Sequence, residues 1–493
     1  MGTIWDYVTW RGDLELARDP FNEIDALLLS MLSYVDLKGA APEAAGNDSA
    51  DDGSAAAAGS TETGTAGAGD GSAAGSTETG TAGVGDGSAA EAGSTETGTA
   101  GAGDAGEFGD AGDVAEDSGA SLAGSLSLKE VSDRFFELHS EEELKQDKTF
   151  VAYVPELMRQ MAGTRRFGDV RVCRFLEEID ETKSQQLAAV TFVLPDDSWF
   201  VSYRGTDDRI IGWKEDFFLA SGIVEAQHGA AAYLTEVCRA AGAAATHSAQ
   251  DGSDAAPRSA QDGNDAATHS VQVSSVSTPS SIQDGSDAAQ SGGAALPRVR
   301  AGGHSKGGNL AVYAAAFCDE DVREMVQDVY CFDGPGFREE IVSSDQMQAM
   351  APRISRFIPE SALVGVLLDH AVPAQIVKST NWGVMQHDAQ SWEVSGPQFV
   401  YAEERSKGSI LFDETMREWL EGISDEERTA YINDFFAVLE APGYETFSEL
   451  QNGGLKALRA MYVRQQQLDP KTREITNRLL RGMISKWTGQ LLS

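Results

Sequence analysis

Basic residues and long apolar runs are both scarce in this sequence of 493 residues. Only 38 Lys and Arg stand against 78 Asp and Glu, a formal net charge of −40. Nucleic acids and anionic membrane surfaces attract proteins through basic clusters, so neither is an expected partner. No apolar run approaches the roughly 20 residues that span a bilayer. The N-terminus also lacks the basic and apolar regions of a secretory signal, so the expected location is the cytoplasm.

Cysteines are few and scattered. The four of them, Cys173, Cys238, Cys318 and Cys331, form no C-x-x-C pair and have no close histidine cluster beside them. Isolated thiols in a large chain are typical of a reducing compartment. We expect no metal site and no cofactor.

Two long segments have too few apolar side chains to build a core. Residues 38–121 carry repeats that begin GSTETGTAG, and residues 39–120 contain 16 Asp or Glu but no Lys or Arg. Residues 242–294 repeat the pattern SAQDGSDAA with small changes. Such compositions favour flexible coil over stacked repeats. We therefore expect two disordered insertions in one domain, which comprises residues 1–37 and 122–493.

Outside these segments the sequence alternates between strand and helix patterns. Residues 187–194 and 199–204 predict a β-hairpin around Pro195–Asp197. Further strands are expected at 298–301, 326–332, 354–358 and 375–378, and helices near 21–29, at 226–241, at 309–317 and from 413 onward. Ser424 with Glu427 forms a capping-box pattern, and Asp469-Pro470 is typical of a helix start. The pattern predicts an α/β fold with a mostly parallel central sheet, flanking helices and a helical C-terminal extension.

Ser305 is the candidate nucleophile. It lies in Gly303-His304-Ser305-Lys306-Gly307, between a strand and a helix pattern. In a G-x-S-x-G turn, small residues let the strand and the helix approach closely, and the helix start offers N–H groups to an oxyanion. Lys306 would supply one of these N–H groups. We expect its side chain to be solvated; the alternative is a cation that selects anionic substrates. A Gly-rich turn with an ordinary serine is the competing interpretation.

Three segments, in order, resemble class 3 lipases and their uncharacterised bacterial relatives. They are VSYRGTD with GWKED (201–207 and 212–216), GHSKGG (303–308) and QHDAQSW (386–392). The likeness covers roughly residues 1–37 and 130–400. It implies an α/β-hydrolase fold, ester hydrolysis and an oxyanion N–H from Thr206, which also ends a strand pattern where free N–H groups are expected. Arg204 and Asp216 are expected to form an ion pair that holds this loop.

The general base must be a histidine, since a serine needs a neighbour that takes its proton near neutral pH. The chain has seven histidines. Two lie in the second insertion (His247, His269), two precede the hairpin or lie in a helix (His139, His228), and His304 is expected to point away from Ser305. Of the remaining His370 and His387, we favour His387, because it lies in the lipase-like segment. A packed histidine beside Trp392 is the alternative.

The acid departs from the resembled pattern. Class 3 lipases carry Asp after the strand that corresponds to residues 354–358, but the sequence there is PESALV. Asp333 ends the preceding strand, in the segment FDGPGF, which resembles the acid segment of pancreatic-type lipases. We rank Asp333 first, Glu360 second and Asp369 third. Asp333 also suits a turn before Gly334-Pro335.

Together these features predict a serine hydrolase that cleaves carboxylic esters, including lipid esters. Ser305 attacks, His387 moves the proton, Asp333 orients the imidazole, and the Thr206 and Lys306 N–H groups hold the oxyanion. A thioesterase or a peptidase would use the same triad. The alternative from another class is a hydrolase-fold protein without catalysis that acts as a binding or scaffold module.

Overall fold

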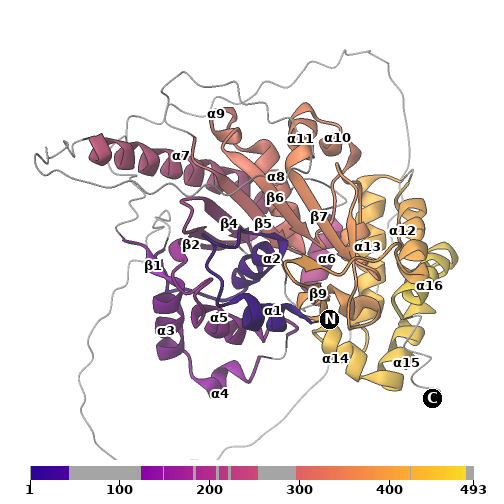
Figure 1. Cartoon of the computed structure of the whole chain (residues 1–493). Helices are drawn as coiled ribbons and strands as arrows, with labels where there is room; N and C mark the ends of the chain where they lie inside the picture. The colour runs from indigo at the N-terminus through magenta and orange to yellow at the C-terminus, as the bar shows by residue number, and fades with distance from the viewer. Residues whose placement is uncertain are drawn as a thin grey trace, which may run out of the picture. The chain divides into compact units, whose positions relative to one another are not determined.

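The structure is a computed structural model of the chain (Figure 1). It describes residues 2–43, 124–147, 149–180, 185–206, 210–219, 222, 224–253, 296–421 and 423–484. Most of the two expected insertions, 38–121 and 242–294, lies outside the described residues.

An eight-stranded mixed sheet forms the centre, with its strands in chain order. They are β1 (Leu126–Ser127), β2 (Arg171–Asp180), β3 (Gln185–Val193), β4 (Trp199–Tyr203), β5 (Val299–His304), β6 (Val326–Phe332), β7 (Ile354–Pro359) and β8 (Gln375–Val377). β1 to β4 pair antiparallel, whereas β4 to β8 pair parallel. The predicted hairpin is confirmed as β3–β4, and the four later strands are confirmed as β5 to β8. β1 and β2 were not predicted.

Helices cover both faces of this sheet (Figure 1). One face carries α1 (Ile4–Arg11), α2 (Glu23–Leu32), α3 (Leu128–Leu138), α4 (Glu141–Leu144) and α5 (Val154–Ala162). The other carries α7 (Glu225–Ser253), α8 (Lys306–Phe317), α9 (Glu320–Arg323), α10 (Glu339–Val342) and α11 (Asp345–Met350). Because both faces are covered, the parallel strands bury residues on both sides, and every residue of β4 and β5 is buried.

Helix α2 attaches the N-terminal segment to the sheet. Asn22 caps it, and the apolar run that follows is almost fully buried. Asp25 in its first turn is also buried, where its carboxylate accepts hydrogen bonds from Arg166 and from the Tyr7 hydroxyl. A buried carboxylate requires such partners. The segment therefore has a defined position, and it carries Tyr34 toward the end of β5.

A third core joins α6 (Ile210–Phe218) to the C-terminal helices beside β8. These helices are α12 (Lys407–Leu420), α13 (Asp425–Glu440), α14 (Phe447–Asn452), α15 (Gly454–Gln465) and α16 (Pro470–Ile484). The first begins at Lys407, earlier than residue 413, because Ser406 caps it. The predicted capping box at Ser424 is confirmed, and Asp469 accepts hydrogen bonds from the first turn of α16. A separate two-stranded antiparallel sheet, β9 (Val394–Ser395) with β10 (Gln398–Phe399), precedes α12.

Both insertion boundaries differ from those expected. Ala40 and Ala41 are buried, and the carbonyl of Pro42 accepts a hydrogen bond from Phe175 at 2.7 Å. Helix α7 continues to Ser253, past the expected boundary at 242. Alanine-rich sequence that extends an existing helix adds one hydrogen bond per residue without a new nucleation step, so low complexity alone does not end a helix.

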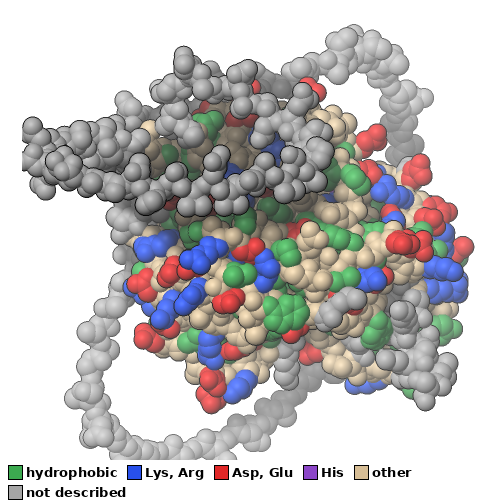
Figure 2. Space-filling view, in the orientation of Figure 1, with side chains coloured by type: hydrophobic (Ala, Val, Ile, Leu, Met, Phe, Trp, Pro, Cys, Tyr) green, Lys and Arg blue, Asp and Glu red, His purple; other side chains and the backbone are tan. Residues whose placement is uncertain are grey.

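The surface carries charges of both signs, and the cysteines are unpaired. Acidic and basic side chains are interspersed over the face in Figure 2. All four cysteines are free thiols. Among the described helices, none has the length and apolar character needed to cross a membrane.

Candidate active site

Ser305 occupies a tight turn between β5 and α8. Its backbone has φ +58° and ψ −134°, a region that non-glycine residues rarely adopt. The turn is held by its N–H, which donates to the Phe332 carbonyl at 2.9 Å, and by its carbonyl, which accepts from Gly308 at 2.8 Å. A strained serine at a strand-to-helix turn is the geometry of the nucleophile elbow.

Glycines make this turn possible. A Cβ atom added at Gly303 would lie 2.3 Å from the carbonyl carbon of Gly307, and one added at Gly307 would lie 2.1 Å from the Tyr203 carbonyl oxygen. Neither neighbour is a flexible side chain, so neither could yield. The expectation that small residues are required on both sides of the serine is confirmed.

His387 and Asp333 are in direct contact. His387 ends the 3-10 helix η4 (Gly383–His387), and its Nδ1 lies 2.7 Å from Oδ2 of Asp333. Asp333 follows β6 at φ +47°, and its other oxygen accepts the Gly365 N–H at 3.1 Å. Since a carboxylate only accepts, Nδ1 carries the proton and Nε2 of the neutral ring is an acceptor. Both residues are buried.

The other candidate acids and the other candidate base lie elsewhere. Asp369 forms an ion pair with Arg417 at 2.7 Å. The backbone of Glu360 bonds to Val377 in the β7–β8 region. Burial holds the pKa of His370 well below its usual value, and the nearby Arg356 and Arg417 add to this effect. Of the three carboxylates, Asp333 is the one whose hydrogen bond to His387 the structure records.

Ser305 is connected to His387 and Asp333 through two neighbouring residues. These are His304, which precedes Ser305, and Phe332, which precedes Asp333. Phe332, whose carbonyl accepts from Ser305, is the neighbour of Asp333. His304 precedes Ser305, and its ring lies 4.6 Å from that of His387. Oγ of Ser305 and Nε2 of His387 are both buried and have no hydrogen-bond partner among the described residues. Two buried polar atoms without partners are unusual, and catalysis is one established reason for them.

His304 has a role that its spacing did not reveal. Its Nε2 lies 2.8 Å from the His387 carbonyl oxygen, so Nε2 carries the proton. Its Nδ1 then accepts from the Tyr34 hydroxyl at 3.0 Å. Burial, followed by the proximity of His387, holds the pKa of His304 well below its usual value, which keeps the ring neutral. No motif pointed to Tyr34, because its 270-residue separation from His304 leaves no local pattern.

Aromatic rings enclose the His387 imidazole. Trp213 of α6 lies 4.9 Å from it in an edge-on arrangement, and Phe150 lies 5.8 Å away. Trp213 also contacts Phe447, which belongs to the C-terminal helices. The imidazole of His387 is thus held in a water-poor setting in which electrostatic interactions are stronger than in bulk water.

The loop after β4 lies against the turn that contains Ser305. A Cβ atom added at Gly205 would lie 2.3 Å from the His304 carbonyl oxygen and 3.0 Å from Cβ of Ser305. Thr206 follows, buried, and its hydroxyl donates to Asp216 at 3.3 Å. The expected Arg204–Asp216 ion pair is wrong, because Arg204 pairs with Glu177 of β2, which lies beyond β3 in the sheet.

Lys306 is the first residue of α8. Its N–H therefore lies at the N-terminal end of the helix, where the dipole favours negative charge. Its side chain is only 5% exposed, so the expectation of a solvated lysine is wrong. The close approach of β5, α8 and their neighbours around the glycine-rich turn leaves little surface at this position.

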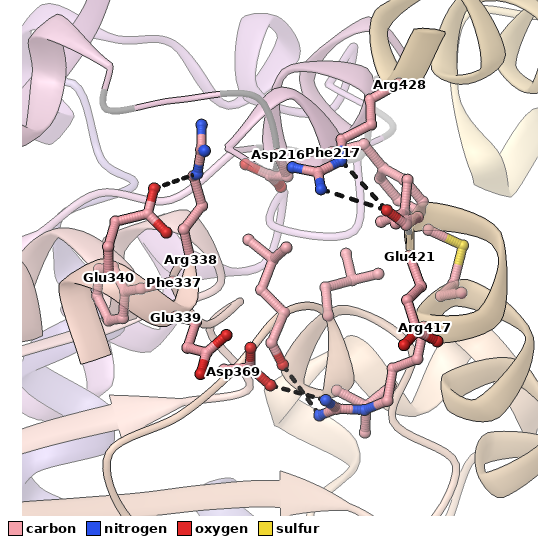
Figure 3. A pocket seen from close by; sticks show the side chains of 15 residues that line it. Asp216, Phe217, Phe337, Arg338, Glu339, Glu340, Asp369, Arg417, Glu421 and Arg428 are labelled. Carbon is pink, nitrogen blue, oxygen red and sulfur yellow. Dashed lines mark hydrogen bonds and ion pairs between the residues drawn. The ribbon is translucent and has the colours of Figure 1, made fainter. Parts of the chain in front are cut away.

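A cavity of about 550 Å³ lies next to the loop (Figure 3). Asp216, which holds Thr206, also lines this cavity. In Figure 3, Arg338 is directed toward Glu340, and Arg417 toward Asp369. The other lining residues are the apolar Phe217, Phe337, Val366, Leu367, Leu368, Met416 and Leu420 and the charged Glu339, Glu421 and Arg428, whereas Ser305, His387 and Thr206 do not line it. Its volume is typical of small-molecule sites.

Comparison with known proteins gives one match. The family described as Mbeg1-like matches residues 161–256 and 290–437, slightly less than half of the chain. Both matched ranges together contain Thr206, Ser305, Asp333 and His387. No curated protein and no solved structure matches the chain.

Proposed function

We propose that the protein is a serine hydrolase that cleaves carboxylic esters through Ser305, His387 and Asp333. One observation carries the proposal. The serine sits in a strained strand-to-helix turn, and a buried histidine whose ring lies 4.6 Å from that of the preceding residue, His304, has one ring nitrogen on a carboxylate and the other without a described partner. An imidazole held by a carboxylate in this way can take the proton of a serine hydroxyl that reaches its other nitrogen.

The reaction follows from these positions. Oγ of Ser305 attacks the acyl carbon while Nε2 of His387 takes its proton, and the imidazolium is stabilised by Asp333. The oxyanion accepts from the N–H groups of Thr206 and Lys306. His387 then gives the proton to the leaving alkoxide, which releases the alcohol and leaves an acyl-serine. Water, deprotonated by His387, hydrolyses this ester and restores Ser305.

We further propose that the fold is of the α/β-hydrolase type. In that fold, the nucleophile lies between a central parallel strand and a helix, and the acid and the histidine follow in this order along the chain. The positions of Ser305, Asp333 and His387 after β5, β6 and β8 support this assignment. The Mbeg1-like match agrees with a lipase-like hydrolase. The four free thiols support a cytoplasmic location.

The cavity beside Thr206 suits the substrate class. Seven of its lining residues are apolar and eight are charged, so both hydrocarbon and a polar group find contacts there, and an ester with one apolar and one polar part fits it best. We therefore place esters of amphiphilic molecules, including lipid esters, ahead of peptides.

Labelling and turnover test the proposal together. A fluorophosphonate probe should modify Ser305 in the folded protein, as located by peptide mass spectrometry, and the protein should hydrolyse short p-nitrophenyl esters. Ser305→Ala should lose both. A matched control is Ser395→Ala, because Ser395 lies in β9, away from the turn. Equal activity in wild type and Ser305→Ala would refute the nucleophile.

A binding or scaffold protein without catalysis is the second candidate. The specific observation in its favour is that Ser305 has no exposed surface in this conformation. An enzyme with this site needs a conformational change that exposes Ser305 before substrate enters, whereas a binding module does not. Absence of labelling at Ser305 in the folded protein, with labelling of a known serine hydrolase under the same conditions, would favour the second candidate.

A further inference from the structure

We infer that the outer face of α15 is a docking surface for anionic lipid membranes. This inference does not depend on the proposed function, because it concerns a surface of the C-terminal helices. It differs from the expectation based on net charge, which stays a prediction, that an anionic membrane surface is not a partner.

Helix α15 has two distinct faces. Ala457, Met461 and Gln465 are buried and face the neighbouring helices. The exposed side carries Leu455, Tyr462 and Val463, which are 71%, 61% and 54% exposed. Single exposed apolar residues are ordinary, but three on one face of one helix form a patch that water does not favour.

The charged residues of this face are all basic. Lys456 and Arg459 are exposed between the apolar residues and form no ion pair with any described residue. Arg464 is partly neutralised by Asp434 at 3.9 Å. A shallow groove of about 640 Å³ runs along the face, and its lining includes Lys456, Arg459 and Arg464 but no Asp or Glu.

The surrounding sequence extends this charge. Residues 454–484 contain seven Lys or Arg and two Asp or Glu, a net charge of +5 in a chain of −40. The segment lies beyond the residues matched by the Mbeg1-like family, which end at 437. The basic character is therefore local to α15 and α16, and a net charge for the whole chain conceals it.

An anionic lipid surface matches both properties of the face. Helices that lie in the membrane interface combine basic residues with exposed apolar and aromatic side chains. The cations contact the lipid headgroups, and the apolar groups enter the boundary between headgroups and acyl chains. The acidic residues 44–123 of the same chain are a second possible occupant of this face, but they match only its charge. Among residues 44–123 the large apolar residues are Val84, Phe108, Val114 and Leu122, too widely spaced to cover the three exposed side chains.

Vesicle co-sedimentation of the full chain tests the inference. The protein should bind vesicles that contain phosphatidylglycerol, and binding to pure phosphatidylcholine vesicles should be at least tenfold weaker. Added salt should weaken the binding, since the attraction is screened. Lys456→Glu/Arg459→Glu should lower binding to the anionic vesicles at least tenfold. Leu455→Ser/Val463→Ser should also lower binding to the anionic vesicles, even at low salt, where the attraction between charges is strongest.

A matched control separates this face from general surface effects. Leu296→Ser/Arg298→Glu also changes one exposed leucine and one exposed cation, but on the strand β5 side of the molecule. Its binding should equal that of wild type, and thermal melting should show all variants folded. Equal losses in the control, or no binding of wild type to anionic vesicles, would overturn the inference. A dimer that Leu455→Ser/Val463→Ser dissociates, without vesicle binding, would assign the face to a second copy and overturn it too.

Discussion

Nδ1 of His387 lies 2.7 Å from Oδ2 of Asp333, although 54 residues separate the two in the sequence. The contact joins the end of β6 to the segment after β8, on two strands separated by β7. Two more hydrogen bonds hold Asp333. Its own N–H donates to the Phe357 carbonyl at 2.7 Å, and its Oδ1 accepts from the Gly365 N–H. A carboxylate fixed in this way can hold one tautomer and one orientation of the imidazole.

The first prediction concerns this carboxylate. Asp333→Asn should lower kcat for a p-nitrophenyl ester by roughly 10⁴-fold, because an amide that donates to Nδ1 favours the wrong tautomer. Steady-state kinetics measure the loss, and a thermal melt checks that the variant is folded. Asp369→Asn is the control, since Asp369 pairs with Arg417 instead. A comparable loss in Asp369→Asn or in Glu360→Gln would show that the acid has been misassigned.

The second prediction concerns His304, which bonds to the backbone of His387. His304→Phe keeps a ring but removes the donor, so the His387 segment loses its tie to the nucleophile turn. Misplacement of a base by about 1 Å costs on the order of 100-fold, and kcat/KM should fall by about this factor.

The conservative variant gives the comparison. His304→Gln keeps an amide N–H that can reach the same carbonyl, so it should retain more activity than His304→Phe at equal stability. If both variants are equally impaired, or neither is, the hydrogen bond to His387 does not position the base.

The strands that sequence patterns predicted well are parallel strands with β-branched and aromatic residues. β6 (VQDVYCF) and β7 (ISRFIP) combine such residues with a buried C-terminal half, and their bounds were predicted within one residue. β2 was missed because its sequence, RVCRFLEEID, is largely charged. Its neighbour β1 pairs with only Arg171 and Val172, so most of β2 lies at an edge of the sheet where charged side chains reach water.

The candidate site likewise contains some features that the sequence predicts and others that it does not. The turn at Ser305 was predictable, because its glycine requirement is local and leaves a motif. The Asp333–His387 contact was only ranked first among three, since chain order permits each carboxylate and only the packing of β6 against β7 decides between them. Tyr34 and the burial of Lys306 had no local signal at all. Both depend on how α2 and α8 pack against β5, which is set by the whole fold.

The third prediction concerns the loop that carries Thr206. Gly205→Ala places a methyl group against the His304 carbonyl and Cβ of Ser305, so the loop must move away from the nucleophile. Loss of one oxyanion donor costs roughly 10²- to 10³-fold in kcat, and this variant should fall in that range. Gly242→Ala is the matched control, because a Cβ there meets only Met325 at 3.9 Å. A fully active Gly205→Ala variant would contradict the role of this loop.

The fourth prediction concerns stability at acidic pH. Burial holds the pKa values of His304 and His370 well below the ordinary value, so both are neutral in the folded protein. In the unfolded chain each titrates near pH 6.5. Below that pH the unfolded state binds more protons, so their contribution to stability is present above about pH 6.5 and is lost as the pH falls. The slope that each contributes rises below pH 6.5 toward a limit of about 1.4 kcal/mol per pH unit.

Urea unfolding at a series of pH values isolates one of these groups. Acidic side chains also lose favourable interactions on acidification, so the comparison between variants is the informative quantity. His370→Gln removes a titrating group whose Nε2 has no partner among the described residues. Its free energy of unfolding should therefore fall less steeply than that of wild type between about pH 6.5 and pH 5, by a difference that grows toward about 1.4 kcal/mol per pH unit at the acidic end. An unchanged slope in His370→Gln would mean that His370 takes up its proton in the folded state, and that its burial between Arg356 and Arg417 does not hold it neutral.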